Sequence, residues 1–285
     1  GAEGASAYAD ALTANLASGA ARIAFPTDGM RIAMTYKSLG SPKFVSYLND
    51  AVFYCGDLGK RGVGDFAWAL IAVEHCGARF PDNAANTPET LLKSIAEAEL
   101  EGGGFALTGT APDADTTAIV LRALAPHRDA CAELVARTLN ALSALQQESG
   151  AFASLGTETA ESTAQAVLAL SALGIAPDAD ERFVKNGVTC VEALYGFATA
   201  DGFAHIHGGE TDALATAQAL SALRACETPQ QSGSATEGTE NTPAVSPAAQ
   251  ESGTGRTVFL VAAVAAVAAG AAVFLRVRFT KQYQK

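Results

Sequence analysis

Two aspartates near the middle of the chain, Asp113 and Asp115, are the side chains best suited to proton chemistry. They lie in the run PDADTT, just before a stretch with helical periodicity. Carboxyls held close together can retain a proton, so the pair could supply a general acid. An aspartate at a helix start can instead accept hydrogen bonds from free backbone N–H groups. Acid, helix cap and ligand contact therefore remain open for this pair.

Two histidines in the segment GFAHIHGGETD could hold a metal ion. His205 and His207 lie near Glu210 and Asp212, and imidazole and carboxylate groups both bind zinc. In a strand or a turn, His-x-His places the two rings on one side, whereas in a helix it does not. The alternative is a polar loop facing solvent.

Other polar side chains recur at matching places in otherwise apolar helical stretches. They are Thr117, Thr163, Gln165, Thr216 and Gln218, and the step Thr-Ala-Gln occurs twice. These residues could face a hollow and bind a ligand, or they could cap helices and bond between them. We also include Trp68, the one tryptophan, with Asp115 and His205 among the ligand-binding candidates, because aromatic faces attract cationic groups.

Helices must position these side chains, since 49% of the residues are hydrophobic and only 7% are aromatic. Thr87 before Pro88 is a helix start, and Gly77 and Gly174 are helix ends. Helical periodicity predicts helices at 5–19, 28–39, 42–54, 64–76, 88–100, 115–125, 128–146, 160–173, 180–195 and 212–225. We therefore expect an all-α domain over residues 1–226.

Three segments of this domain, 101–124, 148–173 and 199–223, look alike. Each has a glycine-phenylalanine turn, a polar loop and a helix with a Thr-Ala step. The phenylalanines at 105, 152 and 203 are 47 and 51 residues apart, which is typical of a helix-pair repeat. The helices at 88–100, 128–146 and 180–195 would then be the outer partners of the pairs.

These turns resemble those of the terpene cyclase and protein prenyltransferase superfamily, which includes squalene-hopene cyclase. The carrying motifs are GGGF, QQESGAF and DGF, while PDADTTAIVLRAL resembles a class II cyclase helix that begins D-x-D-D-T-A. The runs at 63–77 and 161–187 are similar to a bacterial surface-protein branch related to the α-domains of intrinsic factor and transcobalamin. The resemblance covers roughly residues 8–225.

The resemblance implies an α/α toroid, in which inner helices line a central hollow and outer helices surround them. A full toroid has about twelve helices, so one pair could be missing at the N-terminus. In class II cyclases the middle aspartate of the motif is the acid, which would be Asp115, but Thr116 replaces the third aspartate. In the cobalamin carriers, polar side chains at these helix starts contact the ligand, which implies a corrinoid as a possible ligand.

The segment Thr257–Leu275 contains 19 residues without a charge. As a helix it would be about 28 Å long, enough to cross a bilayer. The tail 276–285 carries four positive charges, which predicts a cytoplasmic end and an exterior N-terminal domain at the plasma membrane. Residues 227–256 are rich in Ser, Thr, Pro, Gly and Glu, which predicts a disordered linker. The N-terminus lacks a signal peptide, so we expect a mature form or a fragment.

Charge and cysteine content limit the remaining function classes. All 30 acidic residues and 14 of the 19 basic ones precede position 256, so this part carries a net charge of −16. A domain this acidic repels phosphate backbones, which excludes a nucleic-acid partner. The five cysteines lack metal or redox spacing and could be buried thiols, disulfides or ligands.

Together these features predict a single-pass cell-surface protein whose toroid is a non-catalytic binding module. Its partner would be a small ligand such as a corrinoid or an isoprenoid, or a surface protein or glycan. The alternatives are a divergent terpene cyclase or prenyltransferase-type enzyme, a corrinoid-binding surface protein and a structural spacer.

Overall fold

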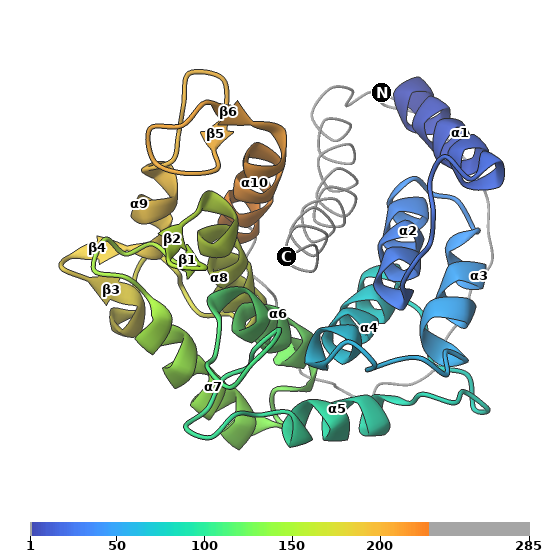
Figure 1. Ribbon diagram of the computed structural model, residues 1–285, viewed down its shortest axis with the longest axis horizontal. Coiled ribbons are helices and arrows are strands. Elements are labelled where there is room, and N and C mark those ends of the chain that lie inside the picture. The colour runs from blue at the N-terminus through green and yellow to red at the C-terminus, as the bar shows by residue number, and fades with distance from the viewer. Residues whose placement is uncertain (1, 228–285) are drawn as a thin grey trace, which may run out of the picture.

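A computed structural model of the chain describes residues 2–227, which form a helix-rich fold with only short strands (Figure 1). This confirms the helical class predicted from composition. The α-helices are α1 (Ala2–Ser18), α2 (Pro26–Ser38), α3 (Phe44–Leu48), α4 (Val63–Cys76), α5 (Pro88–Glu97), α6 (Ala114–Leu124), α7 (Ala132–Leu145), α8 (Ala160–Ala172), α9 (Cys190–Tyr195) and α10 (Ala213–Glu227).

The helices form two layers along an open arc (Figure 1). Helices α2, α4, α6, α8 and α10 pack side by side in that order. Helices α3, α5, α7 and α9 lie outside this series, against α2, α4, α6 and α8 respectively. The arc does not close into a ring within residues 2–227.

Small residues let the inner helices approach closely. Helices α8 and α10 pack against each other, and their alanines Ala164 and Ala215 are fully buried. The aromatic side chains of the glycine turns fill the space between the layers, since Phe105 and Phe152 have no exposed surface. At Gly150 the backbone has φ +83°, and a Cβ would lie 3.0 Å from the Val188 carbonyl oxygen, so glycine is required there.

Helix ends follow the predicted caps in several places. The Thr87 side chain accepts a hydrogen bond from the Thr90 N–H, and α4 ends at Gly77 in the left-handed region. Helix α3 continues into a π-helical turn, Asn49–Phe53, so the helix predicted at 42–54 changes its winding midway. The helix predicted from 128 begins only at Ala132, because residues 128–131 form a turn that follows the 3₁₀ turn at Ala125–His127.

The helix predicted at 180–195 is wrong. A 3₁₀ turn (Glu181–Phe183), a β-hairpin and the short α9 occupy this segment instead. The hairpin pairs β3 (Val184–Lys185) with β4 (Val188–Thr189), and Asn186 and Gly187 between them both have positive φ. Asn-Gly is a strong signal for a two-residue hairpin turn, and it overrides the helical periodicity around it.

Two more hairpins lie in the loops that precede α8 and α10. Strand β1 (Ala153–Ser154) pairs with β2 (Thr157–Glu158), and β5 (Phe203–Ala204) pairs with β6 (Thr211–Asp212), both antiparallel. Each hairpin therefore links a glycine-phenylalanine turn to the inner helix that follows it.

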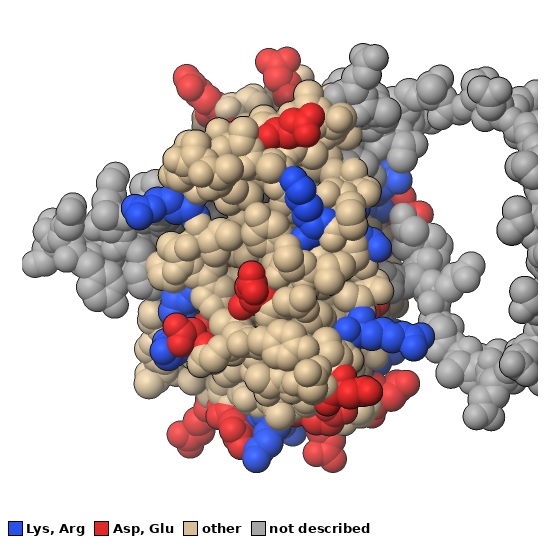
Figure 2. Space-filling model, turned by 90° about the vertical axis from the view of Figure 1, so that its right-hand side faces the viewer, with Lys and Arg blue, Asp and Glu red and all other residues tan. Residues whose placement is uncertain are grey.

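None of the helices within residues 2–227 combines the length and apolar character needed to cross a membrane. The predicted membrane segment Thr257–Leu275, the linker beyond residue 227 and the tail 276–285 lie outside the described residues. On the face of the molecule shown in Figure 2, basic and acidic side chains are interspersed over a mostly uncharged surface.

Candidate functional site

The three repeated threonines bind the glycine turns of their own repeats. The Thr117 hydroxyl accepts a hydrogen bond from the Phe105 N–H and donates one to its carbonyl, both at 3.1 Å. Thr216 makes the same two bonds with Phe203, at 2.8 and 3.2 Å. The Thr163 hydroxyl accepts from the Phe152 N–H at 3.0 Å and donates to the Thr159 carbonyl. Each hydroxyl is thus used within the fold, and we call this arrangement the threonine clamp.

Asp113 is the N-cap of α6. One carboxylate oxygen accepts from the Thr116 N–H at 2.7 Å, and the other accepts from the Leu107 N–H at 2.7 Å and the Thr116 hydroxyl at 3.0 Å. All three partners are donors, as expected for an aspartate that caps a helix. Asp115 lies half-buried in the first turn of the same helix.

The two histidines contact different carboxylates. His205 Nδ1 lies 2.8 Å from an oxygen of Glu161 in α8, whereas His207 Nε2 lies 3.3 Å from an oxygen of Glu158 in β2. The His207 ring also stacks on Phe197, with centroids 3.8 Å apart. The contacts fasten the β5–β6 loop to the start of α8. Within residues 2–227 no group of three or more His, Cys, Asp or Glu side chains is arranged to hold a metal ion.

Gln165 and Gln218 meet between α8 and α10. The Gln165 side-chain amide donates to the Gln218 amide oxygen at 2.8 Å. The Gln165 Oε1 is buried and accepts no hydrogen bond. The two glutamines therefore join neighbouring inner helices and leave one acceptor unused.

All five cysteines are free thiols. Cys76 and Cys190 are fully buried, and burial raises their pKa values to about 11 and about 12. The Cys190 thiol donates to the Pro177 carbonyl oxygen at 3.1 Å. Such thiols stay protonated at neutral pH and are weak nucleophiles and weak metal ligands.

Trp68 lies half-buried on α4, under an arginine that the sequence did not single out. The Arg31 guanidinium of α2 is centred 5.0 Å from the centroid of the Trp68 ring. Arg31 is only 5% exposed, and its Nε has no hydrogen-bond partner. Burial lowers its pKa to about 10, and the neighbouring Arg61 acts in the same direction, while Asp28 opposes them.

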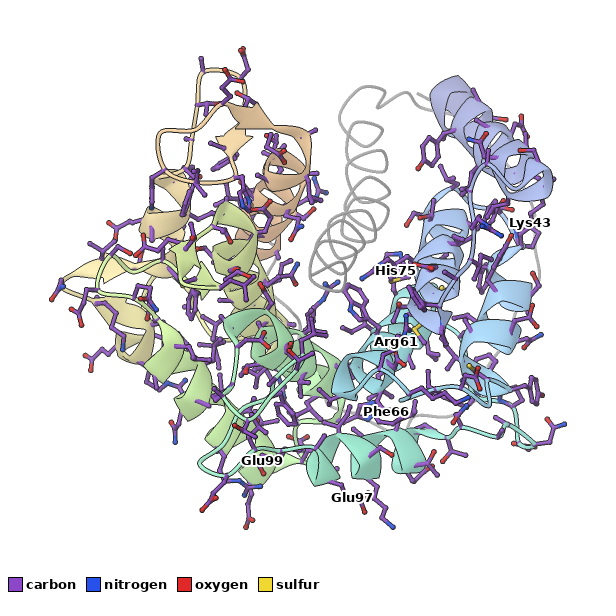
Figure 3. The ribbon with its side chains drawn as sticks, in the orientation of Figure 1. Lys43, Arg61, Phe66, His75, Glu97 and Glu99 are labelled. Atoms are coloured by element: carbon purple, nitrogen blue, oxygen red, sulfur yellow. The ribbon has the colours of Figure 1, made fainter. Side chains whose placement is uncertain are left out.

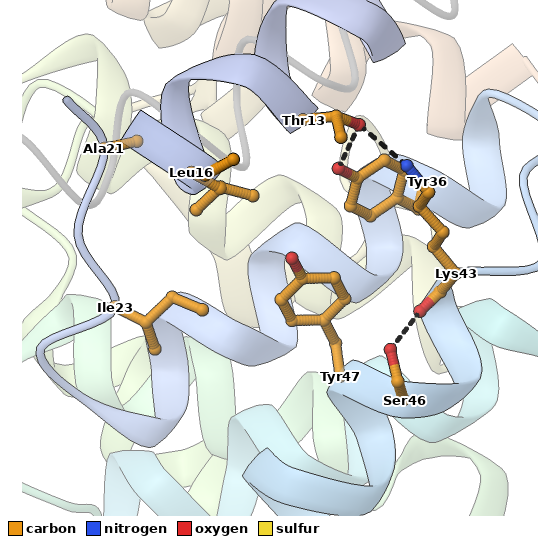
Figure 4. Close-up of a pocket in the computed structure, with 9 residues that line it drawn as sticks. Thr13, Leu16, Ala21, Ile23, Tyr36, Lys43, Ser46 and Tyr47 are labelled. Atoms are coloured by element: carbon orange, nitrogen blue, oxygen red, sulfur yellow. Dashed lines mark hydrogen bonds between the residues drawn. The ribbon is translucent and has the colours of Figure 1, made fainter. Parts of the chain in front are cut away.

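A pocket of about 590 Å³ opens between α1, α2 and α3 (Figure 4). This volume is within the usual range for small-molecule sites. Its lining is Thr13, Leu16, Ala17, Ala21, Ile23, Tyr36, Lys43, Ser46 and Tyr47. The aliphatic side chains come from α1 and the segment after it, whereas α2 and the region of α3 supply most of the polar groups.

The polar groups of the pocket converge on one threonine. The Thr13 hydroxyl lies 2.8 Å from the Tyr36 hydroxyl and accepts a hydrogen bond from Lys43 Nζ at 3.0 Å. The rings of Tyr36 and Tyr47 stack, with centroids 5.5 Å apart. Burial, and next the Tyr36 hydroxyl, raise the pKa of Tyr47, so that its hydroxyl remains a donor.

Lys43 keeps donor capacity toward the pocket. No carboxylate of the described residues forms an ion pair with it, and an ammonium group has three N–H donors. Figure 3 shows Lys43 close to α1 and α3, on the opposite limb of the arc from α8 and α10. The pocket is therefore remote from the predicted residues Thr163, Gln165 and Gln218.

No protein-family model matches the chain, and no curated protein matches it.

Proposed function

We propose that the chain is a membrane-anchored cell-surface protein whose helical domain is a non-catalytic binding module. The alternation of inner and outer helices along the arc supports assignment of this domain to the α/α toroids. The uncharged run Thr257–Leu275 and the basic tail after it support a single-pass anchor with the domain outside.

One observation carries the choice of ligand: the pocket between α1, α2 and α3 has aliphatic walls and one cationic end. Leu16, Ala17 and Ile23 offer apolar surface, and Lys43 offers N–H donors beside the Thr13 and Tyr36 hydroxyls. A ligand that matches has a hydrocarbon body and an anionic head. Isoprenoid phosphates belong to this class.

Catalysis receives less support than binding. In the cyclase motif the acid would be Asp115, and its neighbour Asp113 is bound by three hydrogen-bond donors as the N-cap of α6. The threonines expected at the mouth of a hollow hold the glycine turns instead. A corrinoid would need the polar groups of α8 and α10, where the Gln165 and Gln218 amides bind each other.

The test is the melting temperature of the full chain in lipid nanodiscs, with and without candidate ligands. The ligands are farnesyl diphosphate, the uncharged farnesol and cyanocobalamin. A ligand at about 100 times its Kd adds about 2.7 kcal/mol, which is several degrees for a domain of this size. We expect farnesyl diphosphate to raise the melting temperature more than farnesol does.

Two lysine variants make the test specific to the pocket. Lys43→Met removes the cationic end and should weaken farnesyl diphosphate binding about tenfold. Lys93→Met is the matched control, because Lys93 is an exposed lysine of α5. A shift with cyanocobalamin alone would replace the proposal by a corrinoid carrier, and conversion of farnesyl diphosphate would replace it by an enzyme. No shift with any ligand would leave a protein or glycan partner.

A further inference from the structure

Arg31 is a buried cation that forms no ion pair with a carboxylate of residues 2–227. It is 5% exposed and its Nε lies in the interior without a hydrogen-bond partner. Within residues 2–227 no carboxylate, carbonyl or hydroxyl accepts a hydrogen bond from its guanidinium, which contacts the face of Trp68. An arginine in this state is costly, because its five N–H donors lose water and gain little in return.

Asp28, three residues before Arg31, and Asp65, three residues before Trp68, are already engaged. Asp28 accepts hydrogen bonds from the N–H groups of Ala24 and Phe25, at 3.0 and 3.1 Å. Asp65 is 3% exposed and binds Arg61 at 2.7 Å and the Gly59 N–H at 3.1 Å. The Asp65 charge is thus balanced by Arg61, whereas Asp28 acts on Arg31 electrostatically and forms no ion pair with it.

The side of α2 that carries Arg31 reaches the surface one turn earlier, at Thr27. Arg61 Nη2 lies 3.4 Å from the Thr27 hydroxyl, and the Arg61 side chain is 32% exposed. Arg61 also stacks over Phe25, with its guanidinium carbon 4.1 Å from the ring centroid. Figure 3 shows Arg61 beside α4, where this side of α2 meets it. A second guanidinium therefore lies at the exposed edge of the Arg31 region.

We propose that Arg31, flanked by Trp68, Thr27 and Arg61, forms a binding site for a compact oxyanion, the carboxylate or phosphate group of a small ligand. The planar guanidinium presents parallel N–H donors that fit two oxygens of such a group. Trp68 holds the guanidinium plane by a cation–π contact and leaves its edge for the anion.

This site is independent of the pocket assigned to an amphipathic ligand. Arg31 and Tyr36 are five residues apart on α2, so their side chains point about 140° apart around the helix. Loss of binding at one site would therefore leave the other unaffected.

The chain offers a direct optical probe, because Trp68 is its only tryptophan. The experiment titrates the full chain with sodium phosphate, and separately with sodium acetate, and follows Trp68 fluorescence at constant ionic strength set by sodium chloride. Phosphate and acetate distinguish the two sources of the oxyanion. We expect a saturable change with at least one of them, with a millimolar Kd, and none with chloride alone.

Three variants decide the assignment. Arg31→Met should weaken binding at least tenfold. Arg31→Lys should weaken it less, because a lysine keeps the positive charge but lacks the parallel N–H donors of the guanidinium. Arg79→Met, at an exposed arginine just after α4, should bind as the natural chain does. The melting temperature gives a second reading: the bound anion should raise it in the natural chain and in Arg79→Met, and leave it unchanged in Arg31→Met. Equal binding by Arg31→Met, or no saturable change in the natural chain, would overturn the proposal.

Discussion

The two limbs of the arc, α2 and α3 on one side and α6, α8 and α10 on the other, differ in whether their polar side chains have partners. Around α6, α8 and α10, hydroxyls, carboxylates and imidazoles meet partners of the same limb, as in the threonine clamps and the His205–Glu161 contact. Around α2 and α3, the Arg31 guanidinium and the Lys43 ammonium have no carboxylate partner among the described residues. The repeated threonines, Asp113 and the two histidines thus hold the fold, and we propose that Arg31 and Lys43 on the other limb contact ligands.

The largest effect should come from breaking a threonine clamp. Thr163→Val keeps the shape but leaves the buried Phe152 N–H without an acceptor, which should cost about 2 kcal/mol of unfolding free energy. Urea denaturation of the full chain measures this loss. Thr157→Val, at an exposed threonine of β2, is the control and should change the free energy by less than about 0.5 kcal/mol. Equal stability of the two variants would mean that the clamp does not hold the repeat.

Removing the unmatched cation should have the opposite sign. Arg31→Met replaces a buried charge without an ion-pair partner by an apolar side chain, and should raise the free energy of unfolding by about 1–2 kcal/mol in anion-free buffer. Arg61→Met should lower it, because the 3% exposed Asp65 would lose its partner. The same denaturation experiment compares both. A loss of stability in both variants would show that the two arginines are equally integrated in the fold.

The cap of α6 should contribute less. Asp113→Ala removes three hydrogen bonds at the helix start and should cost about 1 kcal/mol, whereas Asp113→Asn should cost less because asparagine also caps helices. Thermal unfolding of the two variants tests this order. If both variants were as stable as the natural chain, Asp113 would not stabilise α6 as a cap, and a chemical role for it would gain support.

The smallest effect concerns the pH dependence of stability. Burial raises the pKa of Glu161, against the opposing hydrogen bond from His205. The carboxyl of Glu161 therefore binds its proton more tightly in the folded chain than in the unfolded chain. Protonated Glu161 adds to the free energy of unfolding at low pH. This contribution is lost as the pH rises through the folded pKa, above about 4.5. Glu161→Gln should flatten the slope of melting temperature between pH 4.5 and 6.5. Glu97→Gln, at an exposed glutamate of α5, should keep the natural slope.

Much of the helical framework could be predicted from the sequence, because local signals and tertiary packing agree there. Thr87 and Pro88 begin α5 and Gly77 ends α4 as expected. The segment 180–195 could not be predicted by periodicity, because Asn186-Gly187 forms a tight turn that periodicity does not register. Asn-Gly was the signal that could have corrected it.

The candidate sites were harder to predict. Trp68 was singled out, but its neighbour Arg31 was not, because an arginine without a partner looks like any other arginine in a sequence. The pocket joins Thr13, Tyr36 and Tyr47, which come from three different helical segments and match no spacing motif. The repeated threonines could be predicted because they recur in the sequence. They recur because each one binds the glycine turn of its own repeat.

Each threonine clamp also has a consequence for how the chain folds. The clamps of Thr117, Thr163 and Thr216 join residues only 12, 11 and 13 positions apart. Loops of about ten residues close within roughly 10–100 ns, far faster than contacts between distant segments form. Each repeat can therefore fix its turn against its own helix before it meets its neighbours. We expect the arc to assemble by addition of units whose turns are already set.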